Sequence, residues 1–195
     1  MRLGIFGGSF DPPHIGHFLA AVDAAEQLSL DRVLWIPAAR QPLKTATPHV
    51  ATPEQRYAMV SAAVRGHSAF AASRIEIERD GLSFTVTTLE ALEREQPAAE
   101  RFLLVGEDTW ARFGDWHQPE RVRALARIVV LTRASGLPHE ERRHTEDGTV
   151  IHLETRRIEV SSTEIRARVA AGKPVRGFVQ DAVADIIESE GLYRW

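Results

Sequence analysis

Apolar residues are spaced along the chain in two ways, which predict strands and helices in alternation. Short continuous apolar runs are typical of buried strands, and apolar positions that recur every three to four residues are typical of amphipathic helices. Such runs predict strands at residues 3–6, 32–36, 102–105 and 128–131, and residues 150–153 can be one more strand. RIEIE at 74–78 alternates like a half-exposed strand. The helical spacing covers residues 15–28, 53–65, 85–95 and 161–172, with short helices around Ala111 and 120–126 and a last helix marked by Val179, Val183, Ile186 and Ile187.

Two of these helices begin with capping signals. Thr52 and Gln55 flank Pro53 as a capping box, and Ser161 with Glu164 forms a second one. Residues 134–149 are polar and predict an exposed loop. Repeated strand–helix alternation predicts an α/β fold, a Rossmann-like doubly wound parallel sheet with helices on both faces. We expect one domain over residues 1–195, since no repeat or linker interrupts the pattern.

Composition and charge narrow the classes of partner. The formal net charge of -3 and the pI near 6.2 argue against nucleic acid or a membrane as partner, so we expect a small ligand. There is no cysteine, which excludes disulfides and thiolate chemistry and fits a reducing compartment. The four-residue apolar run at the N-terminus is too short for a signal peptide, so we expect a cytoplasmic protein. The oligomeric state stays open, a homo-oligomer included.

The turn after the first strand, G-G-S-F-D-P-P-H-I-G-H, holds the clearest chemistry. Gly7 and Gly8 let the backbone approach a ligand, and the helix that follows offers unpaired N–H groups to an anion. His14 and His17 share a helical face and could bind one phosphate group. The glycine patterns of P-loop and dinucleotide-binding proteins are both missing. Capping or packing is the competing interpretation of the histidines, and a zinc pair would lack a third ligand.

This turn resembles the signature of the nucleotidylyltransferase superfamily with the H-x-G-H motif. A second motif of that family, V-S-S-T-E-I-R at 160–166, lies about 145 residues further on. The resemblance implies that His14 and His17 bind ATP phosphates and stabilise the transition state. It also implies that the first turn and the second motif hold ATP, through Gly7, Gly8, Ser9, Phe10, Ser161, Ser162, Thr163 and Arg166. Of these, Arg166 is also expected to take part in catalysis, and Ser161 to cap its helix.

A third stretch is similar to the nicotinate mononucleotide adenylyltransferase family. GEDTWARFGDWH at 106–117 resembles that family's G-x-D block followed by F-x-x-W. The resemblance implies that Trp116 stacks on the pyridine ring and that Asp108 contacts the ribose, with Gly106 and His117 beside them. Core packing is the alternative for Trp116. Ser83-Phe84-Thr85 resembles a helix start at which Thr85 meets the nicotinate carboxylate, and capping is the alternative there. Gly191-Leu192-Tyr193 is also like the family and carries no assigned chemistry.

One position departs from the family. Leu43 stands where many members have a histidine, which puts that histidine's contribution in doubt. Lys44 follows it and is a candidate catalytic contact to phosphate, against the alternative of a solvated lysine. Arg133, at the end of a predicted strand, is a further candidate for ATP binding.

The resemblance implies transfer of AMP from ATP to nicotinate mononucleotide, giving nicotinate adenine dinucleotide and pyrophosphate. Mg²⁺ is expected to be carried with ATP, because the sequence shows no carboxylate cluster dedicated to it. Another adenylyl- or cytidylyltransferase of the superfamily, such as one acting on phosphopantetheine, stays open. So do a non-catalytic nucleotide sensor and a flavodoxin-like interaction module. The preference between nicotinate and nicotinamide mononucleotide is not decided by the sequence.

Overall fold

Strands and helices alternate along almost the whole chain. The computed structural model describes residues 1–40, 50–79, 81–133, 144–148 and 150–194. The strands are β1 (Arg2–Gly8), β2 (Arg32–Pro37), β3 (Phe70–Ala72), β4 (Glu100–Gly106), β5 (Arg127–Arg133), β6 (His144–Asp147) and β7 (Val150–Thr155). The helices are α1 (Ile15–Gln27), α2 (Pro53–Val64), α3 (Thr85–Glu95), α4 (Glu107–Trp110), α5 (Pro119–Leu125), α6 (Ser162–Ala170) and α7 (Asp181–Ser189), with a short 3-10 helix η1 (Phe113–Asp115).

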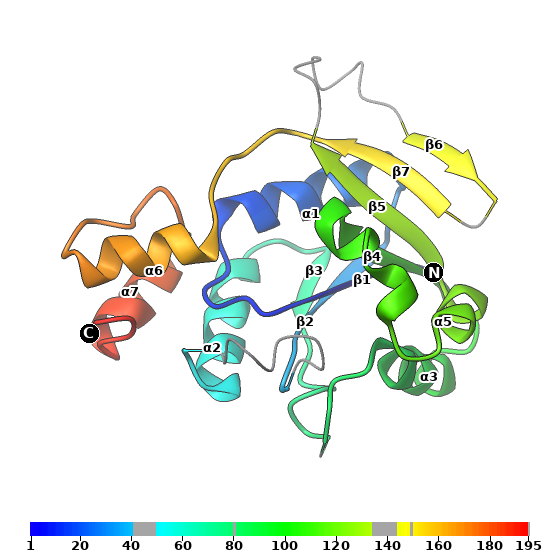
Figure 1. Ribbon diagram of the computed structural model, residues 1–195, viewed down its shortest axis with the longest axis horizontal. Helices are drawn as coiled ribbons and strands as arrows, with labels where there is room; N and C mark the ends of the chain where they lie inside the picture. Colours follow the sequence, from blue (N-terminus) through cyan, green and yellow to red (C-terminus); the bar gives the residue numbers. More distant parts are fainter. Residues whose placement is uncertain (41–49, 80, 134–143, 149, 195) are drawn as a thin grey trace.

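The strands form a seven-stranded sheet in the order β3-β2-β1-β4-β5-β7-β6. All neighbours pair in parallel except β6, which runs antiparallel to β7. The chain moves outward from β1 to β3, then crosses back to β4 on the other side of β1 (Figure 1). The sheet is therefore doubly wound, and the predicted fold class is confirmed.

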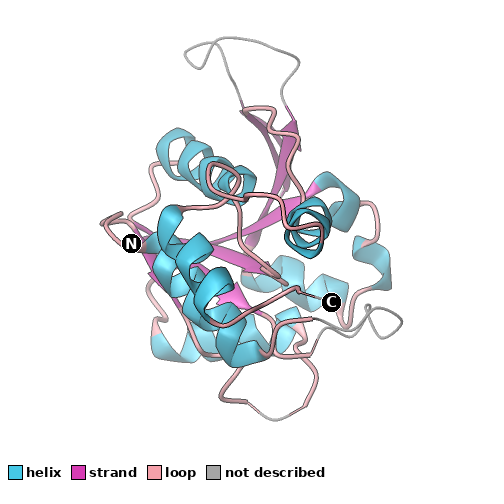
Figure 2. Ribbon diagram, turned by 90° about the vertical axis from the view of Figure 1, so that its left-hand side faces the viewer, coloured by secondary structure: helices cyan, strands magenta, loops and turns pink. Residues whose placement is uncertain are grey.

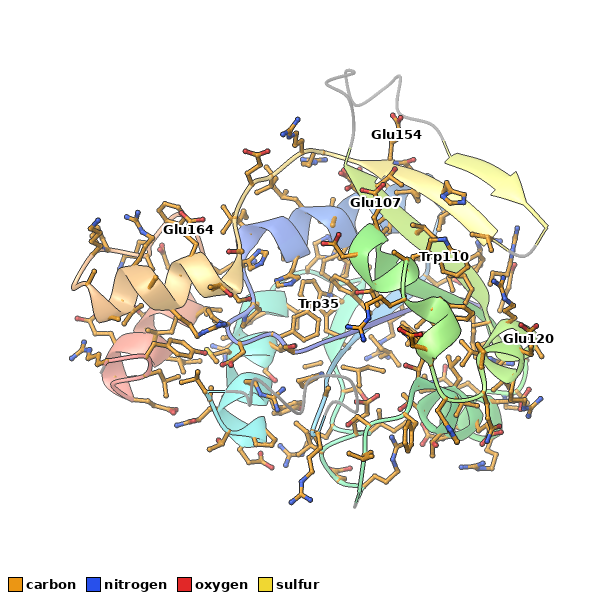
Figure 3. The ribbon with its side chains drawn as sticks, in the orientation of Figure 1. Trp35, Glu107, Trp110, Glu120, Glu154 and Glu164 are labelled. Atoms are coloured by element: carbon orange, nitrogen blue, oxygen red, sulfur yellow. The ribbon has the colours of Figure 1, made fainter. Side chains whose placement is uncertain are left out.

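Helices cover both faces of the sheet (Figure 2). Successive side chains of a strand point to opposite faces, so Ile5 and Phe6 enter different cores. Ile5 packs with α3 and α5, whose buried residues include Leu89 and Leu125. Phe6 packs with Trp35 and with helices α1 and α2, and Trp35 lies in the interior of the molecule (Figure 3). The continuous apolar runs of the sequence thus mark strands buried on both faces.

A third apolar cluster joins α2 to the end of the chain. We call residues 161–194, which contain α6 and α7, the C-terminal lobe. Figure 1 shows α6 and α7 together at one end of the molecule, next to the start of α1. Met59 of α2 packs in this cluster with Ile165, Val183, Ile187 and Tyr193. The lobe is therefore fixed to the sheet domain by an apolar interface of its own.

Two predicted elements are wrong. Residues 74–78 form a hydrogen-bonded turn, in which the N–H groups of Ile77 and Glu78 donate to the carbonyl of Arg74 over 2.8 and 2.9 Å. The edge strand β3 comes before them, because Ser73 is the last residue to bond β2, through the carbonyl of Trp35. Of the predicted loop 134–149, residues 134–143 and 149 lie outside the described residues, and residues 144–147 form β6 by pairing with β7. The other predicted elements are confirmed.

Both predicted caps form. Thr52 accepts the N–H of Gln55 over 3.2 Å, and Gln55 accepts that of Thr52 over 2.9 Å. Ser161 accepts the N–H of Glu164 over 3.1 Å at the start of α6.

No helix within the described ranges is long and apolar enough to cross a membrane.

Candidate active site

The carboxyl ends of β1 and β4 form an open edge where the strand order reverses. Ligands of doubly wound sheets bind at this edge. Gly7 near the end of β1 and Gly106 at the end of β4 are both exposed. A Cβ atom built on either glycine would meet nothing within 4 Å. The motif after β1 and the G-x-D block after β4 therefore flank the same opening.

His14 and His17 stand at the start of α1 and cap it reciprocally. The N–H of His17 donates to Nδ1 of His14 over 3.3 Å, and the N–H of His14 donates to Nδ1 of His17 over 3.2 Å. The two rings stack with centroids 3.6 Å apart. The prediction of a shared face is confirmed, and so is the capping interpretation.

This cap decides where the imidazole protons lie. Because both Nδ1 atoms accept a hydrogen bond, each ring keeps its proton on Nε2. His14 is only 8% exposed, and burial lowers its pKa to about 4, so it is neutral near pH 7. The pair can therefore offer Nε2–H donors to a phosphate group.

The prediction of unpaired N–H groups at the start of α1 is wrong for three of the four. Those of His14 and His17 are used in the reciprocal cap, and that of Ile15 donates to the carbonyl of Phe178 over 2.9 Å. At most the N–H of Gly16 remains for an anion. At this helix start the imidazoles take the place that backbone amides occupy in other phosphate-binding turns.

Close contacts explain two glycines of the motif. A Cβ atom on Gly16 would lie 3.1 Å from the His14 ring, and one on Gly8 would lie 3.0 Å from the Phe10 ring. Phe10 is 1% exposed, and its ring packs against those of Phe6, Trp35 and His17. Its side chain therefore belongs to the core, which leaves only its backbone for the predicted contact with ATP.

The second motif lies directly against the first. Ser162 donates its hydroxyl to the carbonyl of Pro12, and Arg166 donates from Nη1 to the carbonyl of Asp11, both over 2.8 Å. Arg166 also donates from Nη2 to Thr163 over 3.2 Å. The carbonyl of Ser9 accepts from Arg56 over 2.9 Å. The structure thus brings the two predicted ATP motifs together.

The residues predicted for the mononucleotide lie around α3, α4 and η1. Asp108 is exposed on α4, the helix that also carries Trp110 (Figure 3). Trp116 is half-buried against Phe113 at a ring distance of 5.2 Å, so it is partly a core residue as well. His117 is exposed, and its ring lies 4.5 Å from that of Phe84, which directly precedes Thr85. The structure thus places His117 beside the start of α3.

Helix α3 begins at Thr85 without the side-chain cap that α1 and α6 have.

Two of the remaining candidates, Leu43 and Lys44, lie outside the described residues. Arg133 ends β5 as predicted, and only its backbone is described. In the part of the chain that the structure describes, no group of three His, Cys, Asp or Glu side chains is placed to hold a metal ion.

Sequence reasoning missed a buried polar network beneath the motif. Asp11, Arg56 and Tyr193 are 4%, 0% and 2% exposed, and Tyr193 donates to Asp11 over 2.8 Å. Arg56 donates to the carbonyls of Ser9, Ala39 and Ala51. Burial lowers the pKa of Arg56, and Asp11 opposes that change. The only signals in the sequence are an aspartate inside the first motif and the G-L-Y near the other end of the chain.

Comparison with known proteins gives a family for the whole chain. Residues 5–168 match the cytidylyltransferase-like family. The chain is 50% identical to a Gemmatimonas aurantiaca protein named "Probable nicotinate-nucleotide adenylyltransferase", covering 100% of this chain and 93% of that protein. It belongs to the nicotinate-nucleotide adenylyltransferase family. A Thermus thermophilus protein of the same name is 44% identical, with 100% of both chains covered.

Two solved structures share the fold of the chain. The Plasmodium falciparum nicotinic acid mononucleotide adenylyltransferase complexed with NaAD superimposes with a TM-score of 0.76 at 14% identity, covering 98% of this chain and 97% of that one. The same enzyme complexed with APC gives a TM-score of 0.75, covering 98% of this chain and 96% of that one. The chain therefore shares the fold of these two structures.

Proposed function

We propose that the protein transfers AMP from ATP to nicotinate mononucleotide, producing nicotinate adenine dinucleotide and pyrophosphate. The observation that carries the proposal is the reciprocally capped histidine pair, which stands at the open edge of the sheet against the second ATP motif. Full-length identity to adenylyltransferases that are named for nicotinate nucleotide supports the choice of substrate.

The proposed chemistry is a direct in-line displacement. The 5′-phosphate of the mononucleotide attacks the α-phosphorus of ATP, a new P–O bond forms, and the bond to the departing pyrophosphate breaks. A phosphate monoester is already an anionic nucleophile near pH 7, so no general base is required. Catalysis then rests on positioning the reactants and stabilising negative charge. The Nε2–H groups of His14 and His17 suit this task, because both rings are held as donors.

The pyridine side of the substrate fits the uncapped start of α3. A helix start without a side-chain cap can receive a carboxylate through its N–H groups and its dipole. His117, next to Trp116, lies against Phe84 and so beside this helix start. We infer that the nicotinate ring lies between Trp116 and Thr85, with Asp108 and Gly106 toward the ribose.

Magnesium belongs to the proposal as the ion carried by ATP. Bound with ATP, it would supply neutralisation of the phosphate charge, and the donors of the protein would hold phosphate oxygens. Lys44 and Arg133 stay predictions as phosphate contacts, and a cytoplasmic location and a homo-oligomer stay predictions from the sequence.

The test is pyrophosphate release from Mg-ATP with three acceptors in separate reactions: nicotinate mononucleotide, nicotinamide mononucleotide and phosphopantetheine. We expect kcat/KM to be at least ~100-fold higher with nicotinate mononucleotide, which corresponds to ~2.7 kcal/mol of transition-state binding. Release with phosphopantetheine alone would overturn the assignment of Asp108 and Trp116. Binding of ATP without any release would favour a nucleotide sensor.

A further inference from the structure

The C-terminal lobe holds the turn that carries the histidines. Residues 11–15 make four hydrogen bonds with that lobe, each between 2.8 and 2.9 Å long. They run from Ser162 to the carbonyl of Pro12, from Arg166 to the carbonyl of Asp11, from Tyr193 to the Asp11 carboxylate, and from the N–H of Ile15 to the carbonyl of Phe178. The position of His14 is thus set largely by a part of the chain more than 145 residues away.

Asp11 is the centre of these contacts. Its Oδ1 accepts from the Tyr193 hydroxyl over 2.8 Å and from the N–H of Ala51 over 3.1 Å, and its Oδ2 accepts from the N–H of Val50 over 2.8 Å. The carboxylate therefore joins three segments: the turn after β1, the start of α2 and the C-terminal lobe. A buried carboxylate needs such partners, because an unpaired one costs several kcal/mol.

Tyr193 is built into this site as a donor. Burial beside Asp11 raises the pKa of the Tyr193 hydroxyl, so the hydroxyl stays protonated. The backbone of Tyr193 lies in the left-handed region at φ 63°, and that of Phe10, next to Asp11, at φ 49°. Bulky residues rarely adopt this conformation, and it persists only where surrounding contacts enforce it. Strained backbone therefore occurs on both sides of the Asp11–Tyr193 hydrogen bond.

The buried cation Arg56 offsets the negative charge of the buried Asp11 carboxylate. Arg56 is fully buried, and electrostatic attraction links its guanidinium to Asp11. The guanidinium also donates to the carbonyl of Ser9 over 2.9 Å, on the other side of Phe10 from Asp11. The turn is thus held by a cation at Ser9 and by the hydroxyl of Tyr193 at Asp11.

We propose that Tyr193 is a positioning residue for adenylyl transfer: through Asp11 it holds the turn that carries His14 against α6, so that both ATP motifs face one triphosphate. This gives a role to the G-L-Y segment, which the sequence left without chemistry. The inference rests on the proposed function, because it needs ATP as the ligand of both motifs. It assigns Tyr193 no contact with substrate.

The test compares Tyr193→Phe with Tyr57→Phe. The chain has two tyrosines, so the second variant makes the same chemical change at the other one. Tyr57 stacks on Arg74 and is outside both ATP motifs. For Tyr193→Phe we expect kcat/KM for ATP to fall at least ~10-fold, since small misplacements of reacting groups have large effects. The KM for nicotinate mononucleotide should change less than twofold, and Tyr57→Phe should match the unaltered protein.

The outcomes separate the two proposals. Failure of the unaltered protein to release pyrophosphate with any acceptor would overturn the proposed function. Normal activity of Tyr193→Phe, or a rise in the KM for nicotinate mononucleotide as large as the rise in the KM for ATP, would overturn the positioning role while the proposed function stands. If Tyr193→Phe is recovered unfolded, Asp11→Asn, which keeps one acceptor oxygen, takes its place, and the same comparison of the two KM values decides.

Discussion

At the scale of single residues, the site depends on which nitrogen of each histidine carries a proton. The sequence predicts that His14 and His17 share a face, because their spacing is one helical turn. It does not predict their tautomers, which follow from N–H groups that reach Nδ1 only once the helix has formed. The usual capping residues are Ser, Thr, Asp and Asn, so a histidine cap has no standard signal.

Replacing one donor of the pair tests its share in catalysis. We expect His17→Ala to lower kcat for pyrophosphate release at least ~100-fold, as the loss of a charge-stabilising donor does in other transfer reactions. His152→Ala, in strand β7, is the matched control and should keep its activity. Steady-state kinetics at saturating ATP measures both, and a fully active His17→Ala would remove the histidine from the mechanism.

Burial of His14 also predicts a pH dependence of stability. Its pKa is about 4 in the folded protein and 6.5 in the unfolded chain, so between these values only the unfolded chain binds the proton. Acid therefore favours unfolding, and this group should remove about 2 kcal/mol of unfolding free energy between pH 7 and pH 5. Urea unfolding at both pH values should show the loss in the unaltered protein.

His14→Asn is the control for that measurement, because asparagine can cap the helix but does not titrate. Between pH 7 and pH 5, the unfolding free energy of His14→Asn should fall by about 2 kcal/mol less than that of the unaltered protein. An identical pH dependence of both proteins would mean that His14 is not held neutral.

At the scale of elements, a buried ion pair fixes the segment between β7 and α6. Asp23 of α1 is fully buried and accepts from Nη2 of Arg156 over 2.6 Å and from the backbone N–H of the same residue over 2.7 Å. The side chain of Arg156 is 31% exposed. This pair attaches the segment before the second ATP motif to the helix that begins with the first.

Removing the arginine should be costly, because it leaves the buried carboxylate with less compensation. We expect Arg156→Ala to lower the free energy of unfolding by about 3 kcal/mol. Arg157→Ala is the neighbouring control: its ion pair with Glu159 is about 65% exposed, so the change should stay below about 1 kcal/mol. Urea unfolding of both variants measures the difference, and equal losses would contradict the buried-pair argument.

Residues 74–78 and strand β6 were predicted wrongly because their structure depends on contacts with distant elements. RIEIE alternates as a strand does, yet the structure buries Glu76, which accepts from the hydroxyl of Thr88 over 2.7 Å. A polar contact with α3 thus replaces the expected sheet pairing. Strand β6 has no apolar residue and exists through its pairing with β7. Runs such as 3–6 and 128–131 were predictable because both of their faces are apolar.

At the scale of the whole molecule, stability should decrease from the centre of the sheet to its edges. Strands β1 and β4 pair on both sides, whereas β3, with three residues, and β6 form the edges. We expect backbone amides of β1 and β4 to exchange with solvent hydrogen at the rate of global unfolding, and those of β3 and β6 much faster. Mass spectrometry of proteolytic peptides checks this order. Equal protection of β6 and β4 would contradict it.

The sheet and the two sequence motifs could be recognised in the sequence because each depends on neighbouring residues. The contacts between the motifs were not, since Asp11 and Tyr193 are 182 positions apart and no periodicity links them. Arg56 likewise resembles a surface arginine in its sequence context, although the fold buries it completely. Long-range polar contacts of this kind depend on the assembled topology.

The hydrogen bond between Asp11 and Tyr193 has a consequence for synthesis of the chain on the ribosome. The first motif leaves the ribosome early, together with the strand that precedes it, but its partner is translated 182 positions later. The central sheet can pair before that point, since β1, β2, β4 and β5 are already complete. We therefore expect a nascent chain to pair its central strands before the hydrogen bond to Asp11 can form, so a chain whose translation stops before Tyr193 lacks that bond.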